Sequence, residues 1–200
     1  MYKVLARIQG TAPILQHAFG AEAMDSLQQE AKQRTGQVDY SLEWMATMYA
    51  GVDGFLYQPS SHLEAATQKA ASAFKVKGKA GKTFKDAVKA YAYVSPVQPH
   101  LLWNGEPIPT PTKDLLENPT AALQVSTMRV KVQRAAVARS RLMINVGWEL
   151  DFTIDVIDDQ LPQAVVKEAL MEAGRAVGIG DFRPRYGRFN VVAFEVSNGA

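Results

Sequence analysis

The stretch WELDFTIDVIDDQLPQAVVKEALMEAGRAVGIGDFRPRYGRFNVVAFEV, residues 148–196, decides the fold of this 200-residue chain. Its first nine residues alternate between apolar and polar, largely acidic, side chains, the pattern of a strand with one buried face. Pro162, a residue favoured in first helical turns, precedes apolar positions at helical spacing: Val166, Leu170, Ala173 and Val177. After a glycine-rich loop, FNVVAFEV returns as a strand, so the stretch predicts β-α-β.

The N-terminal part of the chain supplies a further strand and helices. Residues 2–9 alternate between apolar and polar side chains and end at Gly10, which predicts a half-buried strand. Residues 21–32, 42–48 and 61–74 are rich in helix formers, and Ser60 or Ser61 is placed to cap the last helix. We therefore expect an α+β fold: a ferredoxin-like or RRM-like antiparallel sheet with helices on one face.

Two irregular segments interrupt this pattern. The lysine-rich FKVKGKAGKTFK, residues 74–85, is broken by Gly78 and Gly81 and predicts a hairpin or tip. Residues 94–120 hold six of the ten prolines and the pair Asn104-Gly105, which favours a tight hairpin turn, and we expect no regular helix there. The chain is predicted to be a single RRM-like domain over residues 1–200, with an insertion or thumb-like region at about 75–135.

The charge is distributed unevenly along the chain. Residues 75–141 hold 12 basic and 4 acidic side chains, against 5 and 7 in residues 1–74 and 5 and 9 in residues 142–200. A basic middle third favours a polyanionic partner, because displaced phosphate counterions provide sequence-independent affinity. The alternative is a solvated lysine-rich loop without a partner.

Composition excludes several function classes. The chain has no cysteine, which excludes disulfides, thiolate metal sites and a cysteine nucleophile. Lys3 and Arg7 fall where a signal peptide needs an apolar run, and no stretch approaches 18 uninterrupted apolar residues. These features predict a soluble cytoplasmic protein without a membrane partner.

The loop between the predicted last helix and last strand combines flexibility with charge. Gly178 and Gly180 permit unusual backbone conformations, and Gly187 would let a neighbouring chain or a nucleic-acid backbone approach closely. Its three arginines, Arg183, Arg185 and Arg188, either contact phosphates or the next subunit, or pair with Asp181, Glu172 or Glu195. A helix terminator needs one glycine, so three favour a binding role. The motif G-x-G-x-x-G is absent, which argues against a dinucleotide site.

Signals for catalysis are weak. Glu149, Asp151 and Asp155 share one strand face, but alternate residues lie nearly 7 Å apart along a strand, so a solvated face is favoured over a metal site. The three histidines, His17, His62 and His100, sit on separate segments without a triad pattern. We expect no enzymatic activity, no cofactor and no bound metal.

IGDFRPRYGRF (179–189) and GFLYQPSSHLEAA (54–66) are two of three places that resemble one family, the RAMP superfamily of RRM-like proteins in CRISPR effector complexes. The first is similar to that family's C-terminal glycine-rich loop, and the second to its proline and serine motif opening a helix. MRVKVQRAAVARSRLMINVGWELDFTIDV (128–156) resembles the basic strand, short excursion and following strand of its backbone subunits. The three places follow the order of the family.

The chain also departs from that family. Glu64 stands where backbone subunits carry a basic residue that often faces RNA. Some relatives carry a cutting aspartate between the first strand and the proline and serine motif; Asp25, Asp39 and Asp53 lie there without a matching local motif. Ser60, Ser61 and His62 could still contact phosphate through hydroxyls and helix N-terminal amides, or form a helix cap with a surface histidine.

The resemblance implies a non-catalytic subunit that binds RNA or a single strand within a multi-subunit, CRISPR-effector-like assembly, with copies of itself and other effector subunits as partners. A minimal or phage-borne relative in antiviral defence would fit the short chain. Alternatives are a homo-oligomeric phage assembly protein and a metal-dependent ribonuclease. The expected nucleic-acid contacts are Lys75, Lys77, Lys79, Lys82, Lys85, Arg129, Lys131, Arg134, Arg139, Arg183, Arg185, Arg188, Ser60, Ser61 and His62, with Gly178, Gly180 and Gly187 forming the loop.

Overall fold

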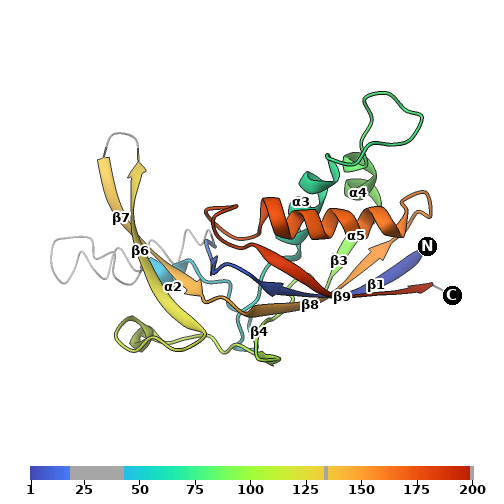
Figure 1. Ribbon diagram of the computed structural model, residues 1–200. Coiled ribbons are helices and arrows are strands. Elements are labelled where there is room, and N and C mark those ends of the chain that lie inside the picture. The colour runs from blue at the N-terminus through green and yellow to red at the C-terminus, as the bar shows by residue number, and fades with distance from the viewer. Residues whose placement is uncertain (19–42, 133–134, 199–200) are drawn as a thin grey trace.

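The computed structural model of the chain describes residues 1–18, 43–132 and 135–198, which form two antiparallel sheets and a layer of helices (Figure 1). The larger sheet has the strand order β5-β4-β8-β1-β9, and β3 also pairs with β8. Its strands are β1 (Tyr2–Gly10), β3 (Ala92–Ser95), β4 (Leu101–Trp103), β5 (Glu106–Pro107), β8 (Trp148–Val156) and β9 (Phe189–Asn198). The strands expected at residues 2–9, 148–156 and 189–196 are therefore confirmed.

Two helices lie on one face of this sheet. They are α3 (Ser60–Ala71) and α5 (Gln163–Glu172), and α5 continues as a π-helical turn, η3 (Ala173–Val177). With α3 between β1 and β3 and α5 between β8 and β9, the chain follows the ferredoxin-like order β-α-β-β-α-β. The expected ferredoxin-like sheet with helices on one face is confirmed.

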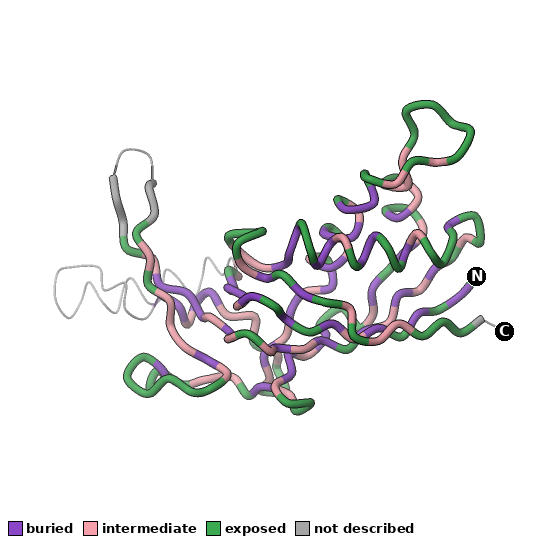
Figure 2. Tube along the Cα trace, in the orientation of Figure 1, coloured by how far each residue is buried: buried purple, intermediate pink, exposed green. Residues whose placement is uncertain are grey.

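The core lies between the sheet and these helices (Figure 2). The apolar stripe of α5 and η3 is buried as predicted: Val166, Leu170 and Ala173 are inaccessible and Val177 nearly so. Tyr2 is buried beside it, and its hydroxyl donates to the carbonyl oxygen of Leu161. Burial, reinforced by the charge of Asp159, raises the pKa of Tyr2 to about 12.

On the opposite face of the sheet, the charged side chains of β1 and β8 pair with each other. Cross-strand neighbours of β1 and β8 bring Lys3 against Asp155 at 3.0 Å and Arg7 against Asp151 at 2.5 Å. Gln9 donates to Glu149 at 3.2 Å. The acidic side of β8 is thus matched residue by residue by β1, which explains its acidity without a ligand.

A β-hairpin projects away from the main sheet (Figure 1). It consists of β6 (Leu123–Val132) and β7 (Ala135–Ile144), and β2 (Ile14–Leu15) adds to the edge of β7. The short α2 (Glu43–Ala46) contacts β7. The stretch expected to form a basic strand, an excursion and a following strand, residues 128–156, covers the end of β6, all of β7 and β8.

The two irregular segments contain a closed loop and a hairpin turn. Residues 72–84 form a loop between α3 and α4 (Lys85–Tyr91), closed by an antiparallel bridge between Lys75 and Thr83. Asn104 and Gly105 have φ values of 53° and 82°, the signs that a tight type I′ turn requires, and they join β4 to β5 as predicted. β3 and β4 belong to the main sheet, although they fall within the insertion expected at about 75–135. The single domain with this insertion stays a prediction.

Two local expectations were wrong. A 3-10 helix, η2 (Lys113–Leu116), occupies the proline-rich segment where no helix was expected, because Thr112 and Asp114 accept turn hydrogen bonds from Leu115 and Glu117. Neither Ser60 nor Ser61 caps α3. Pro59 is the N-cap residue, with no side-chain capping bond, and Ser60 is already helical. The helix expected at residues 42–48 is observed as the shorter α2. The helix expected at residues 21–32 lies outside the described residues.

None of the helices in the described ranges is long and apolar enough to span a bilayer.

Candidate nucleic-acid interface

The glycine-rich loop, residues 178–188, is held against the segment that follows β1. The N–H of Asp181 donates to the carbonyl oxygen of Leu15 at 2.9 Å, and that of Gly187 donates to Pro13 at 2.8 Å. The carbonyl oxygen of Arg188 accepts from Thr11 at 2.8 Å. Bonded at three points, the loop has a fixed shape and presents its remaining side chains in a defined direction.

The glycines serve this internal packing. Gly178, Gly180 and Gly187 have φ values of 72°, 80° and 71°, a region that favours glycine. A Cβ at Gly180 would lie 2.7 Å from the oxygen of Leu15, and one at Gly187 would overlap the carbonyl of Ile179. The close approach expected at Gly187 is therefore made by Ile179 of the same loop, not by a neighbouring chain or nucleic acid.

The three loop arginines do not take the partners that a purely structural role would require. Arg183, Arg185 and Arg188 are exposed and form no ion pair within the described residues. Asp181 pairs with Arg141 instead, and Glu172 pairs with Arg175. The loop thus carries three solvated cations on a fixed backbone, an arrangement that attracts phosphates.

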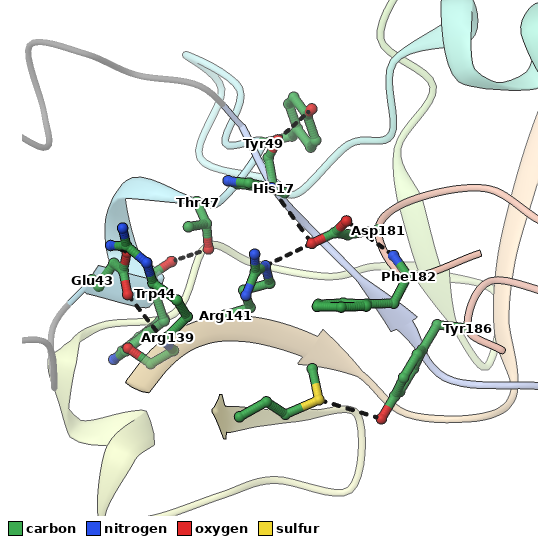
Figure 3. A network of polar contacts seen from close by, with 12 residues as sticks. His17, Glu43, Trp44, Thr47, Tyr49, Arg139, Arg141, Asp181, Phe182 and Tyr186 are labelled. Atoms are coloured by element: carbon green, nitrogen blue, oxygen red, sulfur yellow. Dashed lines mark hydrogen bonds and ion pairs between the residues drawn. The ribbon is translucent and has the colours of Figure 1, made fainter. Parts of the chain in front are cut away.

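Behind the loop lies a buried ion pair between two residues that are 40 positions apart in the sequence (Figure 3). Arg141 of β7 is 7% exposed, and its Nε lies 2.7 Å from Oδ2 of Asp181. Nδ1 of His17 lies 3.4 Å from the same oxygen. The guanidinium also covers the ring of Phe182, with Cζ 5.1 Å from the ring centroid. Arg141 therefore links the hairpin to the loop.

The start of α3 reaches the same place. Nε2 of Gln58 lies 2.5 Å from Nδ1 of His62, and the ring of His62 packs edge-on against Tyr49. Burial lowers the pKa of His62, and the positive charge of Arg183 lowers it further. The hydroxyl of Tyr49 donates to the carbonyl oxygen of His17 at 3.1 Å, and His17 pairs with Asp181. His62 and Asp181 come from the two motifs that resemble the RAMP superfamily, so the fold brings these motifs near each other.

The serines of this motif differ in accessibility. Ser60 is buried and its N–H donates to Val97, whereas Ser61 is exposed. Glu64 accepts a hydrogen bond from the N–H of Val94 at 2.9 Å. The acid at the position that often faces RNA in relatives is thus bound to the backbone of β3.

Basic residues of the hairpin lie beside the loop only at its base. Arg129 on β6 is exposed, and its neighbour Met128 is contacted by the hydroxyl of Tyr186 from the loop, 3.9 Å from Sδ. Arg139 pairs with Glu43 of α2, which also accepts from the N–H of Ser140. Arg134 and the side chain of Lys131 lie outside the described part of the structure.

The lysine-rich loop is separate from this surface. Its five lysines are exposed and follow the C-terminal end of α3, whereas His62 lies at the N-terminal end (Figure 1): Lys75, Lys77, Lys79, Lys82 and Lys85. A 12-residue helix is about 18 Å long. The basic middle third is thus divided between two places. We call the candidate interface the loop surface; it consists of the glycine-rich loop, the start of α3 and the base of the hairpin.

Sequence reasoning missed Arg141, Tyr49 and Phe182. Arg141 continues the basic pattern of β7, but nothing in the sequence places it opposite Asp181. Tyr49 lies outside the recognised motifs. Phe182 has a φ of 53°, a left-handed value that is uncommon for a residue other than glycine and is invisible in sequence.

The acidic and histidine candidates for catalysis are dispersed. Oδ2 of Asp53 lies 2.7 Å from Nε2 of His100 on an exposed turn, and a backbone hydrogen bond from Phe55 lowers the pKa of Asp53, helped by His100. Asp25 and Asp39 fall outside the described residues. No cluster of three His, Asp or Glu side chains within residues 1–18, 43–132 and 135–198 is arranged to hold a metal.

Comparisons with known proteins give a fold. No family model matches the chain. No curated protein matches it either. Among solved structures, a chain of the type III-B Cmr-beta complex bound to cognate target RNA matches with a TM-score of 0.57 at 12% identity, over 100% of this chain and 62% of that one. Cmr6 from Pyrococcus furiosus matches at 9% identity with a TM-score of 0.46, over 96% and 98% of the two chains.

The chain thus spans 62% of the length of the Cmr-beta chain that it matches. The architecture expected from the resemblance to the RAMP superfamily is confirmed, and this chain shares the fold of the matched part of that Cmr-beta chain.

Proposed function

We propose that the chain binds single-stranded RNA on the loop surface, as a non-catalytic subunit of a multi-subunit ribonucleoprotein of the CRISPR effector kind. The observation that carries this proposal is that His62 and Asp181, from two distant motifs, are connected through Tyr49 and His17 beside exposed and unpaired loop arginines. A fixed row of arginines suits a phosphate backbone, which is read by charge and position.

The fold supports the same proposal. The matching Cmr-beta structure contains target RNA. The polar face of the main sheet is satisfied by its own ion pairs, so the loop surface is the stronger candidate for a polyanion. Copies of this chain and other effector subunits are the partners that the proposal implies.

The test begins with the full chain purified without removal of nucleic acid. Sequencing of the bound material should return RNA, and the stripped protein should shift a labelled single-stranded RNA in gels. A duplex RNA of the same sequence should bind more weakly, because its backbone is held in a rigid helix. Failure of the stripped protein to bind any single strand at low salt would reject the proposal.

A nuclease is distinguished in the same assay. Incubation of the labelled RNA with and without magnesium should leave its length unchanged over hours. Shortened RNA that depends on magnesium would replace the non-catalytic role with the ribonuclease alternative.

A further inference from the structure

Phe182 is an exposed aromatic residue in a conformation that its side chain disfavours. It is 41% exposed and has a φ of 53°. The left-handed region is disfavoured for a residue with a Cβ, because the Cβ comes too close to the following carbonyl oxygen. Such a conformation persists where the surroundings over-determine it, and it occurs preferentially at functional sites.

Local hydrogen bonds fix the backbone of Phe182 in this state. Its N–H donates to Oδ1 of Asp181 at 2.9 Å, and its carbonyl oxygen accepts from Tyr186 at 3.2 Å. Asp181 is itself bonded to Leu15, so the turn is anchored to the segment after β1. The ring is thus held at the surface by the fold, although an apolar side chain gains nothing from exposure to water.

The guanidinium of Arg141 supports the ring from behind. It lies 5.1 Å from the ring centroid and is buried, while the other oxygen of the Asp181 carboxylate balances its charge (Figure 3). The Nε–H is close to that oxygen without pointing at it, and Nη1 is buried without a hydrogen-bond partner among the described residues. Arg141 is therefore committed to holding Asp181 and Phe182, and it is a positioning residue.

The exposed part of the ring is next to cations. Arg183 follows it directly, and Arg185 lies two residues further on, both exposed. The one carboxylate of the loop, Asp181, is engaged by Arg141 and His17. An exposed aromatic surface flanked by solvated arginines matches a nucleotide, which offers a flat base beside a phosphate.

We propose that Phe182 is a stacking platform for one base of a bound single strand, with Arg141 fixing the ring and the adjacent arginines contacting the flanking phosphates. This inference rests on the proposed function and adds a base contact to it. Stacking tolerates any base, because every base has a flat face. The platform therefore adds affinity and fixes the position of the strand without selecting a sequence.

The experiment uses the full chain and a single-stranded RNA that carries one 2-aminopurine, whose fluorescence changes on stacking. Phe182→Leu should weaken RNA binding roughly 5- to 150-fold, the range for loss of one base–aromatic stack, and abolish the fluorescence change. Phe182→Tyr should retain both, and a melting curve of each variant checks folding. Because no charge is removed, the salt dependence of binding by Phe182→Leu should equal that of the parent.

The role of Arg141 is tested by a double-mutant cycle. Arg141→Lys should weaken binding, and its effect should vanish in the Phe182→Leu background, which a merely structural contribution would not do. If the parent protein binds RNA but Phe182→Leu binds as tightly, the platform is refuted and the proposed function stands. If the parent binds no RNA, the proposed function fails first. Loss of self-association in Phe182→Leu with unchanged RNA affinity would assign the ring to a subunit contact instead.

Discussion

Arg141 and Asp181 form a buried ion pair that joins the hairpin to the glycine-rich loop, with Nε and Oδ2 2.7 Å apart. The Arg141 side chain is 9% exposed and that of Asp181 is 26% exposed. A charge at such depth depends on its partner, because water no longer solvates it. The pair therefore controls both the stability of the loop surface and its shape.

Asp181→Asn should lower the free energy of unfolding by about 3 kcal/mol, since it leaves the guanidinium of Arg141 buried and unpaired. Urea denaturation measures this loss. Glu172→Gln is the matched control, because it removes the partner of the exposed Arg175 and should cost less than about 1 kcal/mol. Equal losses in the two variants would show that the Arg141 pair is not buried in solution.

Gly180→Ala should destabilise the protein more than Gly78→Ala does. Both positions have a positive φ, so both substitutions carry a strain of about 1 kcal/mol. Only at Gly180 does the added Cβ meet Ile14 and the backbone oxygen of Leu15, which adds about 1–3 kcal/mol of overpacking. Thermal unfolding measures both variants, and equal melting temperatures would contradict the tight packing of the loop on β2.

The fold was predictable because its elements carry strong periodic signals. The alternation in residues 148–156 and the helical spacing of Val166, Leu170, Ala173 and Val177 both report burial on one face, and burial is what the fold imposes. The cap of α3 was not predictable in this way. Serine is a good cap in general, but Pro59 with its preset φ already ends the preceding segment one residue earlier.

The candidate site was predictable in composition more than in arrangement. The three loop arginines are exposed, but two of their suggested acidic partners, Asp181 and Glu172, pair with Arg141 and Arg175 instead. The charge count along the sequence likewise placed the lysine-rich loop and the hairpin in one basic region, whereas the two lie apart in space. Contacts between distant segments depend on topology, and local patterns carry no information about them.

The pKa of His62 should lie below its usual value of about 6.5, because burial and the charge of Arg183 disfavour the protonated ring. The unfolded state then binds more protons than the folded state between the two pKa values. The free energy of unfolding is therefore highest above the pKa that His62 has in the unfolded state. It decreases as the pH drops from that value to the lower pKa of the folded state. Titration of the His62 ring protons by NMR measures the folded value.

Arg183→Gln provides the control for that titration. Removal of the nearby positive charge should raise the pKa of His62 part of the way, while the contribution of burial remains. Arg185→Gln removes an equal charge that does not perturb His62 and should leave its pKa unchanged. An identical His62 pKa in the parent and Arg183→Gln would place the two side chains apart and would separate Arg183 from the start of α3.

Replacing Arg183, Arg185 and Arg188 by Gln should weaken RNA binding and reduce its dependence on salt. Each cation that neutralises a phosphate of a single strand contributes about 0.7 to the slope of log affinity against log salt, so the slope should fall by about 2. Binding isotherms at several salt concentrations measure it, with an RNA of about six nucleotides to confine contacts to one site. The control variant replaces three exposed cations on other surfaces, Lys3, Lys89 and Lys167, and should keep the parent slope.

The lysine-rich loop distinguishes a local site from an extended one. Lys75, Lys77 and Lys79 lie about a helix length from His62, so their replacement by Gln should not affect binding of the short RNA. A longer RNA that reaches both places should lose affinity in this variant as well as in the arginine variant. If the lysine variant weakens the short RNA as much as the arginine variant does, the lysines contact the strand as well, and a site confined to the loop surface is contradicted.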